Sequence, residues 1–158
     1  TGQRQRLNLI RGLLRKDKEI YLLDEPTSNV DVETEEKMVE LIKSVLRDKT
    51  KAFAKTIVLL CRQIKATHKE AVLTNQLLRS GTSIGANLHE AQYAQGTKDF
   101  ISKFEIALKE CHETEYWLEL LHETGYIPED QYKPLQNDCG AVRRMLIASI
   151  NTVKENTK

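Results

Sequence analysis

Two neighbouring carboxylates near the start of the chain have the residue types and spacing that could do chemistry. Asp24 and Glu25 directly follow a short apolar run, residues 20–23, which predicts a buried β-strand. A carboxylate at the end of a buried strand suits magnesium binding and the activation of water in phosphoryl transfer. That chemistry also needs a loop that holds phosphates, and the sequence contains no G-x-x-x-x-G-K-[ST] motif. The two acids therefore lack the group that would place a nucleotide beside them.

The surroundings of these acids resemble part of a known family. Residues 21–31 read YLLDEPTSNVD, which resembles the Walker B strand and D-loop of ABC-transporter ATPases. Residues 1–7 read TGQRQRL and resemble the tail of the signature motif of that family. The resemblance implies that Asp24 would bind magnesium and that Glu25 would activate water. It implies that Asp31 would face a partner subunit. Gly2 and Gln3 would donate to a γ-phosphate.

The departures from the ABC family argue against ATPase activity. The Walker A loop and the glutamine loop are absent, and Arg62 stands where the resemblance requires a switch histidine. We therefore interpret residues 1–50 as a truncated ABC ATPase-like segment whose matched residues are vestigial, with no catalytic residue and no cofactor. Its expected elements form a helix-strand-helix fragment of an α/β domain: a helix ending near Arg15, the strand, and a helix from about Asp31 to Arg47.

From Lys51 onward the apolar residues repeat only at helical spacing. Four stripes follow one another, beginning at Phe53, Leu73, Phe100 and Leu135. Gly125 suits the end of the third helix, and Pro128 suits the start of the fourth. Four amphipathic helices joined by short connections predict an all-α, up-down-up-down four-helix bundle over residues 51–158.

Two segments of the bundle carry a second resemblance. Residues 77–91 read LLRSGTSIGANLHEA, and residues 103–126 contain KFEIALKE and ETEYWL. Both resemble hallmarks of the four-helix-bundle proteins encoded in 23S rRNA intervening sequences of bacteria. The resemblance covers residues 51–156 and implies the same bundle fold and a homo-oligomer of ring-like form. The hallmark residues, which are candidates for an interface, are Arg79, Ser80, Gly81, Gly85, Asn87 and Glu90.

Each hallmark residue admits a structural and a functional interpretation. The two glycines fall inside a helix, where glycine costs about 1 kcal/mol relative to alanine. They therefore indicate either close packing of helices or a functional requirement. The polar members form either a hydrogen-bonded network that sets helix register or a patch for a partner.

The first bundle helix carries the best candidate for a binding surface. At 100° per residue its cations fall on one stripe, opposite the apolar face, and no acid interrupts them. Such a stripe suits the phosphates of RNA or DNA. The alternative is an ordinary solvated face, paired with the acid-rich third helix (Glu105, Glu113, Glu115, Glu119, Glu123). The candidate nucleic-acid-binding residues are Lys51, Lys55, Arg62, Lys65 and Lys69.

Other candidates are weaker. Glu119 and His122 form one E-x-x-H, the spacing of di-iron bundles, but such sites need a second copy and two further glutamates, so we expect no metal. Three aromatic residues of the third helix and its end, which suit a core or a subunit interface, are Tyr116, Trp117 and Tyr126.

The composition sets the class of protein. The net charge is +1, three cysteines lie far apart, and no apolar run approaches the roughly 20 residues of a membrane span. These features predict a cytoplasmic protein without membrane insertion. We interpret the chain as a non-enzymatic, oligomeric four-helix bundle that binds nucleic acid. The alternatives are a pure protein-interaction scaffold and an ATP-binding fragment of an ABC transporter.

Overall fold

The computed structural model describes the backbone of residues 32–156 and the side chains of residues 43–154. The chain divides into two units, Thr1–Val45 and Leu46–Lys158, and the second contains the bundle. The expected helix ending near Arg15 and the expected strand lie outside the described residues. So do the five vestigial ABC-like residues, which are Gly2, Gln3, Asp24, Glu25 and Asp31.

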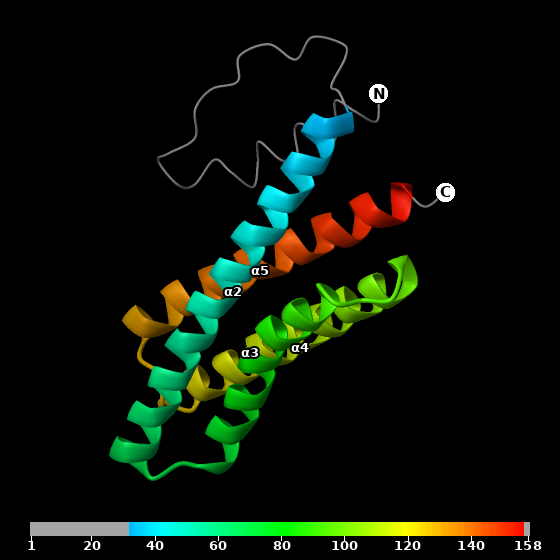
Figure 1. The fold of residues 1–158 in the computed structure, drawn as a ribbon. Coiled ribbons are helices and arrows are strands. Elements are labelled where there is room, and N and C mark those ends of the chain that lie inside the picture. The colour runs from blue at the N-terminus through cyan, green and yellow to red at the C-terminus, as the bar shows by residue number, and fades with distance from the viewer. Residues whose placement is uncertain (1–31, 157–158) are drawn as a thin grey trace. The chain divides into compact units, whose positions relative to one another are not determined.

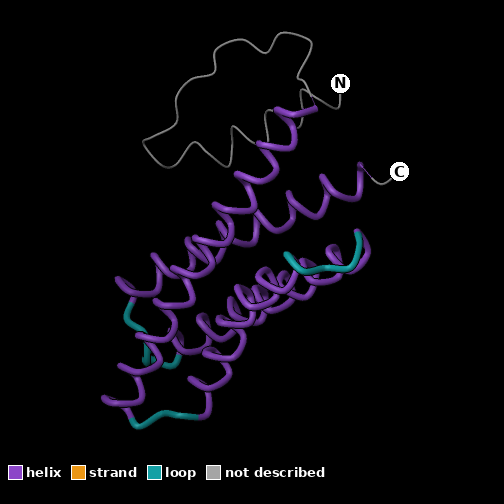
Figure 2. Tube along the Cα trace, viewed as in Figure 1, coloured by secondary structure: helices purple, strands orange, loops and turns teal. Residues whose placement is uncertain are grey.

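Every regular element among the described residues is an α-helix. The four helices are α2 (Val32–His68), α3 (Val72–Ala91), α4 (Thr97–Glu123) and α5 (Glu129–Asn156). From Leu46 onward the helices alternate in direction and are joined by short loops (Figures 1 and 2). The predicted all-α four-helix bundle is confirmed.

The first bundle helix differs from the prediction in its start. The sequence placed the end of one helix near Arg47 and the start of the bundle at Lys51, whereas α2 continues without a break through both positions. The physical reason is that α2 contains neither glycine nor proline, so nothing interrupts its hydrogen bonds. Leu46 and Thr50 are both buried in the bundle. The buried Thr50 hydroxyl donates to the Leu46 carbonyl at 2.9 Å, which satisfies it within the helix.

Most of the core comes from the apolar stripes that the spacing predicts, whereas Leu73 and Phe100, which begin two of them, are only half-buried. Ile57, Leu77, Ile84, Leu118 and Leu146 are all fully buried, at most 1% exposed. The wider stripes also supply Phe53, Leu60, Ile64, Leu88, Ala91, Phe104, Ala107, Leu121, Leu135, Val142 and Ile150. Ile127, Met145 and Ala148 are buried as well, outside the predicted stripes. Burial of this area from water is the main term that stabilises the bundle.

The three cysteines belong to this core. Cys61, Cys111 and Cys139 are buried free thiols. Burial raises the pKa of Cys61 to about 11. The hydrogen bond with Cys111, followed by burial, raises the pKa of Cys139 well above its usual value. Cys61 and Cys139 therefore stay protonated, and all three buried side chains pack as small apolar groups.

The two glycines of α3 play different parts in its packing on α2. A Cβ atom added to Gly81 would lie 3.0 Å from Cγ2 of Ile57, which is tighter than ordinary contact. A Cβ added to Gly85 would lie 3.7 Å from the Thr50 hydroxyl oxygen, at an ordinary contact distance. Close packing therefore explains Gly81 but not Gly85.

One of the two described turns with a left-handed residue uses glycine, and the other uses lysine. Gly125 has φ of +81° after the C-cap residue Thr124 and so ends α4, as the sequence predicted. Between α2 and α3, Lys69 has φ of 58°, and the Glu70 carboxylate accepts hydrogen bonds from the Leu73 and Thr74 N–H groups at 2.9 Å. These bonds satisfy backbone donors at the start of α3. None of the helices that the structure describes is long and apolar enough to cross a lipid bilayer.

Candidate nucleic-acid interface

Four of the five predicted cations lie on α2. Lys51, Lys55 and Arg62 are exposed on its outward side. Lys65 is half-buried, and its ammonium donates a hydrogen bond to Oδ1 of Asn75 on α3. Lys69 departs from the prediction because α2 ends at His68, and Lys69 lies in the following loop with a left-handed backbone. The stripe on the helix is therefore Lys51, Lys55, Arg62 and Lys65, which we call the α2 stripe.

The acids of α4 do not pair with this stripe. Glu105 pairs with Lys154 at 2.7 Å and Glu115 with Arg143 at 2.9 Å, both on α5. Glu113 pairs instead with Arg79 of α3. Among the described side chains, no carboxylate forms an ion pair with a member of the α2 stripe. The α2 cations thus keep their charge available to solvent ions or to a polyanion.

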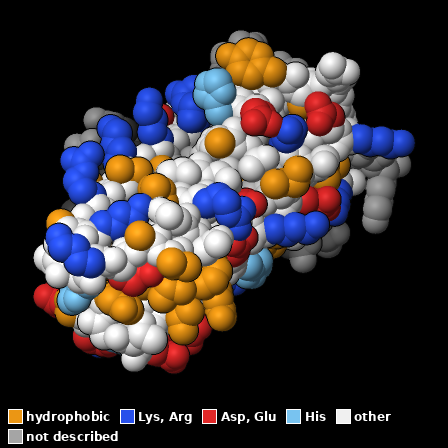
Figure 3. Space-filling view, turned by 90° about the horizontal axis from the view of Figure 1, so that it is seen from below, with side chains coloured by type: hydrophobic (Ala, Val, Ile, Leu, Met, Phe, Trp, Pro, Cys, Tyr) orange, Lys and Arg blue, Asp and Glu red, His pale blue; other side chains and the backbone are white. Residues whose placement is uncertain are grey.

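Charge is divided unevenly between the two halves of the bundle. Residues 46–91 contain eight Lys and Arg against three Asp and Glu, whereas residues 97–156 contain seven against eleven. Figure 3 shows Lys and Arg side chains gathered along one edge of the face that it displays. A surface with clustered cations attracts an extended anion even where the net charge of the chain is close to zero.

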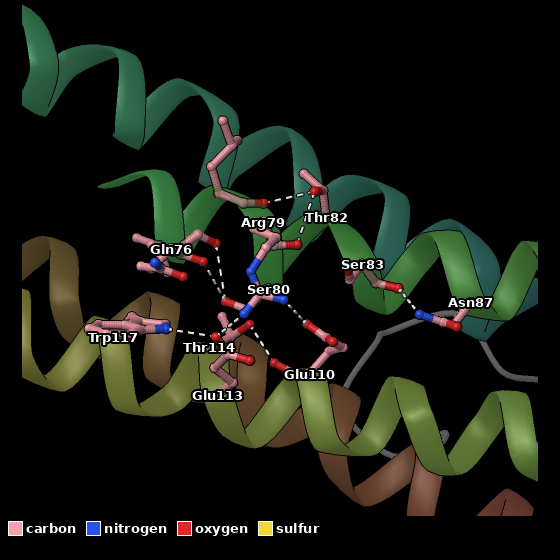
Figure 4. A network of polar contacts seen from close by, with 12 residues as sticks. Gln76, Arg79, Ser80, Thr82, Ser83, Asn87, Glu110, Glu113, Thr114 and Trp117 are labelled. Atoms are coloured by element: carbon pink, nitrogen blue, oxygen red, sulfur yellow. Dashed lines mark hydrogen bonds and ion pairs between the residues drawn. The ribbon is translucent and has the colours of Figure 1, made fainter. Parts of the chain in front are cut away.

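The hallmark Arg79 joins α3 to α4. Its guanidinium pairs with the Glu113 carboxylate and lies 3.7 Å from Oε2 of Glu110 (Figure 4). The Trp117 indole donates to Oε1 of Glu113 at 3.1 Å. The hydrogen bond from Trp117, followed by the one from Arg79, lowers the pKa of the Glu113 carboxyl. This network fixes how α4 lies against α3.

Glu110 is the least satisfied member of that network. Its Oε2 atom is buried and, within the described part of the chain, accepts no hydrogen bond. Burial raises the pKa of the Glu110 carboxyl, although the nearby Arg79 acts in the opposite direction. A carboxylate in this position is less stable than one in water.

The remaining polar hallmark residues are satisfied within the bundle. The Ser80 hydroxyl donates to the Gln76 carbonyl at 3.1 Å, and the Asn87 amide donates to the Ser83 carbonyl at 2.9 Å (Figure 4). Glu90 pairs with Lys103 of α4. The Ser80 and Asn87 hydrogen bonds lie within α3, so among these contacts only the Glu90–Lys103 pair acts between helices, as the register interpretation requires.

The single E-x-x-H is used to hold the α4–α5 turn. The Nδ1 atom of His122 donates to the Ile127 carbonyl at 2.8 Å, and its Nε2 lies 2.8 Å from the Glu129 carboxylate. Its ring stacks on Tyr132 with centroids 4.2 Å apart. Glu119 is exposed to solvent. Within the described residues, no three His, Cys, Asp or Glu side chains gather where a metal ion would bind.

The aromatic candidates occupy three environments. Trp117 is half-buried beside Glu113, and Tyr126 is half-buried with its ring 5.4 Å from that of His68. Tyr116 is 55% exposed on α4. The sequence reasoning missed a fourth, Tyr93, which is 75% exposed in the loop after α3. Its exposure could have been suspected from the sequence, because it is an aromatic residue among polar residues in a predicted loop.

Comparison with known proteins decides the family of the bundle. The profile of the 23S rRNA-intervening sequence protein family matches residues 43–148. The chain belongs to this family. A crystal structure from Bacteroides thetaiotaomicron, described as a protein with unknown function from the S23 ribosomal protein family, has a TM-score of 0.69 and 49% sequence identity. The similarity covers 70% of this chain and 98% of that one, and it confirms the bundle fold predicted from the second resemblance.

The partial similarity to ABC transporters is also confirmed. The chain is 53% identical over 49 residues to the ABC transporter gloK of Glarea lozoyensis, which covers 31% of this chain and 4% of gloK. It is 49% identical over 49 residues to the Beta-(1-->2)glucan export ATP-binding/permease protein NdvA of Mesorhizobium japonicum, covering 31% of this chain and 8% of NdvA. The chain therefore spans less than a tenth of the length of these curated relatives.

Proposed function

We propose that this member of the 23S rRNA-intervening sequence protein family is a non-enzymatic protein that binds nucleic acid through the α2 stripe. The observation that carries the proposal is that Lys51, Lys55 and Arg62 are exposed while three acids of α4, Glu105, Glu113 and Glu115, pair with α3 and α5. Binding to phosphates releases the counterions condensed on the nucleic acid, which is the main source of affinity for such a surface. The stripe needs no catalytic group to do this.

The ABC-like segment adds no ATPase activity under this proposal. Its matched carboxylates, Asp24 and Glu25, lack a phosphate-binding loop in this sequence, and hydrolysis depends on holding the phosphates as well as the metal. We expect the full chain neither to bind nor to hydrolyse ATP.

A matched pair of double variants tests nucleic-acid binding. Lys55→Gln with Arg62→Gln removes two exposed cations of the stripe, and Lys109→Gln with Arg144→Gln removes one exposed lysine and one exposed arginine from α4 and α5. Fluorescence anisotropy of the full chain with labelled RNA and DNA is measured over a salt series. The stripe variant should lower the slope of log affinity against log salt by about 1.4 on single strands. The matched control should keep the wild-type slope.

Two results would contradict the proposal. The first is that the wild-type chain binds neither RNA nor DNA at low salt. The second is that the α2 and the α4/α5 variants weaken binding equally, because net charge rather than the stripe would then set the affinity. Far-ultraviolet circular dichroism of each variant verifies that the helices are retained.

A second candidate function is self-association into a scaffold, and the uneven charge favours it. The acid-rich half exposes Glu119, Glu123, Asp130 and Asp138, which complement the cations of α2 on another copy. A contact between two different faces is head-to-tail and closes into a ring when its rotation permits. Sedimentation velocity should show assemblies that dissociate as salt rises from about 0.05 M to about 0.5 M. Assemblies that resist salt would contradict this electrostatic contact.

A further inference from the structure

We infer that the nucleic acid bound by this chain is single-stranded, with its phosphates along the α2 stripe and one base stacked on Tyr93. The inference rests on the proposed function and adds the class of nucleic acid and a second contact. It follows from the position of two exposed rings at the end of α3, those of His89 and Tyr93, relative to the cations of α2.

Tyr93 presents its ring to solvent from an ordered position. At 75% exposure it is the most exposed large apolar side chain among those described. Its N–H donates to the Glu90 carbonyl at 2.9 Å, which ties the residue to the end of α3. The His89 ring lies 5.6 Å from the Tyr93 ring between centroids, tilted by 43°. The pair forms a surface on which a base could stack, since every base has a free π-face when it is unpaired.

The spacing on α3 places this pair on the side that borders the α2 stripe. Asn75, Thr82 and His89 follow one another at intervals of seven residues, so they share one side of the helix. Asn75 at one end of this row accepts the hydrogen bond from Lys65 of the stripe. His89, at the other end of this row, therefore lies on the same side of α3, along the border between α2 and α3, which we call the α2–α3 margin.

The contacts between α2 and α3 give the direction of that margin. Gly81 lies against Ile57 and Gly85 against Thr50, so the two helices run antiparallel. His89 is one turn beyond Gly85, in the direction that leads along α2 from Thr50 toward Leu46. From Lys65 to Lys51 the α2 stripe extends about 21 Å at 1.5 Å per residue. A strand that follows the stripe from Lys65 to Lys51 and continues for about one more helical turn reaches the level of the aromatic pair.

The acids of this region have contacts of their own, and Asp48, three residues before Lys51 on α2, pairs with Arg47 at 3.5 Å. Glu90 pairs with Lys103, and the Asp99 carboxylate accepts a hydrogen bond from the Gln95 N–H at 3.1 Å. Glu70, at the opposite end of α3, accepts hydrogen bonds from the start of that helix. The margin therefore combines cations with an exposed aromatic ring, which is the combination that single-strand binders use. A duplex keeps its bases paired and stacked, so it gains nothing from Tyr93.

Variants of Tyr93 test the inference on the full chain. Tyr93→Ala removes the ring, Tyr93→Phe keeps it, and Tyr116→Ala removes an exposed ring from α4 as a matched control. The probes are a fluorescent oligouridylate of about 12 nucleotides, within the range of known single-strand sites, a DNA duplex of the same length, and inorganic polyphosphate as a competitor without bases. Thermal unfolding of each variant is followed in parallel.

Stacking predicts a specific pattern. Tyr93→Ala should weaken oligouridylate binding about tenfold or more, while Tyr93→Phe and Tyr116→Ala keep the wild-type affinity. The salt slope should stay unchanged in Tyr93→Ala, because no cation is removed. The affinities of Tyr93→Ala for the duplex and for polyphosphate should also equal those of the wild type.

The different failures can be told apart. If Lys55→Gln with Arg62→Gln weakens every probe while Tyr93→Ala binds oligouridylate like the wild type, the stacking inference is wrong and the proposed function stands. If Tyr93→Ala weakens duplex and oligouridylate equally, the preference for single strands is wrong. If the stripe variant binds every probe with the wild-type affinity, the proposed function fails and this inference fails with it.

Discussion

The bundle contains two sets of charged side chains that differ in what they touch. On α4 most of the acids contact cations of neighbouring helices, such as Arg79 on α3 and Arg143 on α5. On α2 the exposed cations Lys51, Lys55 and Arg62 have no carboxylate partner among the described side chains. α2 packs on α3 by other means: the close approach at Gly81 and hydrogen bonds from Cys61 and Lys65.

This difference separates charge that orders the fold from charge that is left for a partner. Ion pairs between helices fix register and orientation, since each needs two side chains at matching heights. A helix seated by close apolar contact needs no such pairs, so its outward residues are under no packing constraint. The exposed members of the α2 stripe, Lys51, Lys55 and Arg62, are therefore cations whose charge makes no ion pair within the described part of the fold.

The steric contact between α2 and α3 offers the largest effect that would test this comparison. Gly81→Val should destabilise the protein by about 2–3 kcal/mol, because its side chain would collide with Ile57 in the core. Gly85→Ala should instead be neutral or stabilise by up to about 1 kcal/mol through helix propensity, because a Cβ atom there fits at 3.7 Å from Thr50. Urea denaturation followed by circular dichroism measures both free energies of unfolding. Equal losses in the two variants would show that close approach at Gly81 is not what seats α3 on α2.

Loss of an ion pair of α4 should lower the free energy of unfolding by less than Gly81→Val does. Loss of cations from the α2 stripe should hardly change it. Arg143→Leu removes the half-buried partner of Glu115, 2.9 Å away, and should cost about 1 kcal/mol. Lys55→Gln with Arg62→Gln should change the free energy of unfolding by less than about 0.5 kcal/mol, as exposed substitutions usually do. The same urea titrations report both values. A stripe variant that destabilises as much as Arg143→Leu would mean that the stripe serves the fold.

The spacing of apolar residues was sufficient to predict the four helices and their core. Burial repeats with the helix period, so the buried stripe of Phe53, Ile57 and Ile64 could be assigned without knowing any partner helix. The partners of the charged residues could not be assigned in this way. Whether Glu115 meets Arg143 or a lysine of α2 depends on how the helices are rotated and aligned, which periodicity leaves open.

Three local features also lay beyond the sequence reasoning. The continuity of α2 was missed because the resemblance to two families suggested a boundary at residues 50–51, where the backbone has no breaker. The turn at Lys69 was missed because lysine carries no preference for positive φ. The exposure of Tyr93 was missed because a short connection reveals nothing about which way its side chains point. The contact of Glu113 with Trp117, in contrast, follows the i, i+4 spacing and was available from the sequence.

Glu110 and Glu113 give the smallest expected effect and the sharpest test, because one α4 acid is poorly paired and the other well paired. The pKa of Glu113 is lowered by Trp117 and Arg79, so its stabilising contribution is present above the ordinary value of 4.5 and is lost as pH falls below it. The pKa of Glu110 is raised by burial, so its charged form destabilises the fold at neutral pH and protonation relieves this as pH falls.

Substituting each acid by its amide should therefore have opposite consequences at pH 7. Glu110→Gln should stabilise the protein by at most about 1 kcal/mol, because it removes a buried charge that lacks a hydrogen bond. Glu113→Gln should destabilise it and flatten the fall of stability between about pH 5 and pH 3. Urea titrations at pH 7, 5 and 3 measure both effects. If Glu110→Gln is instead as destabilising as Glu113→Gln, then Arg79, 3.7 Å from Oε2 of Glu110, stabilises both carboxylates, and the contrast between a poorly paired and a well paired acid on α4 is lost.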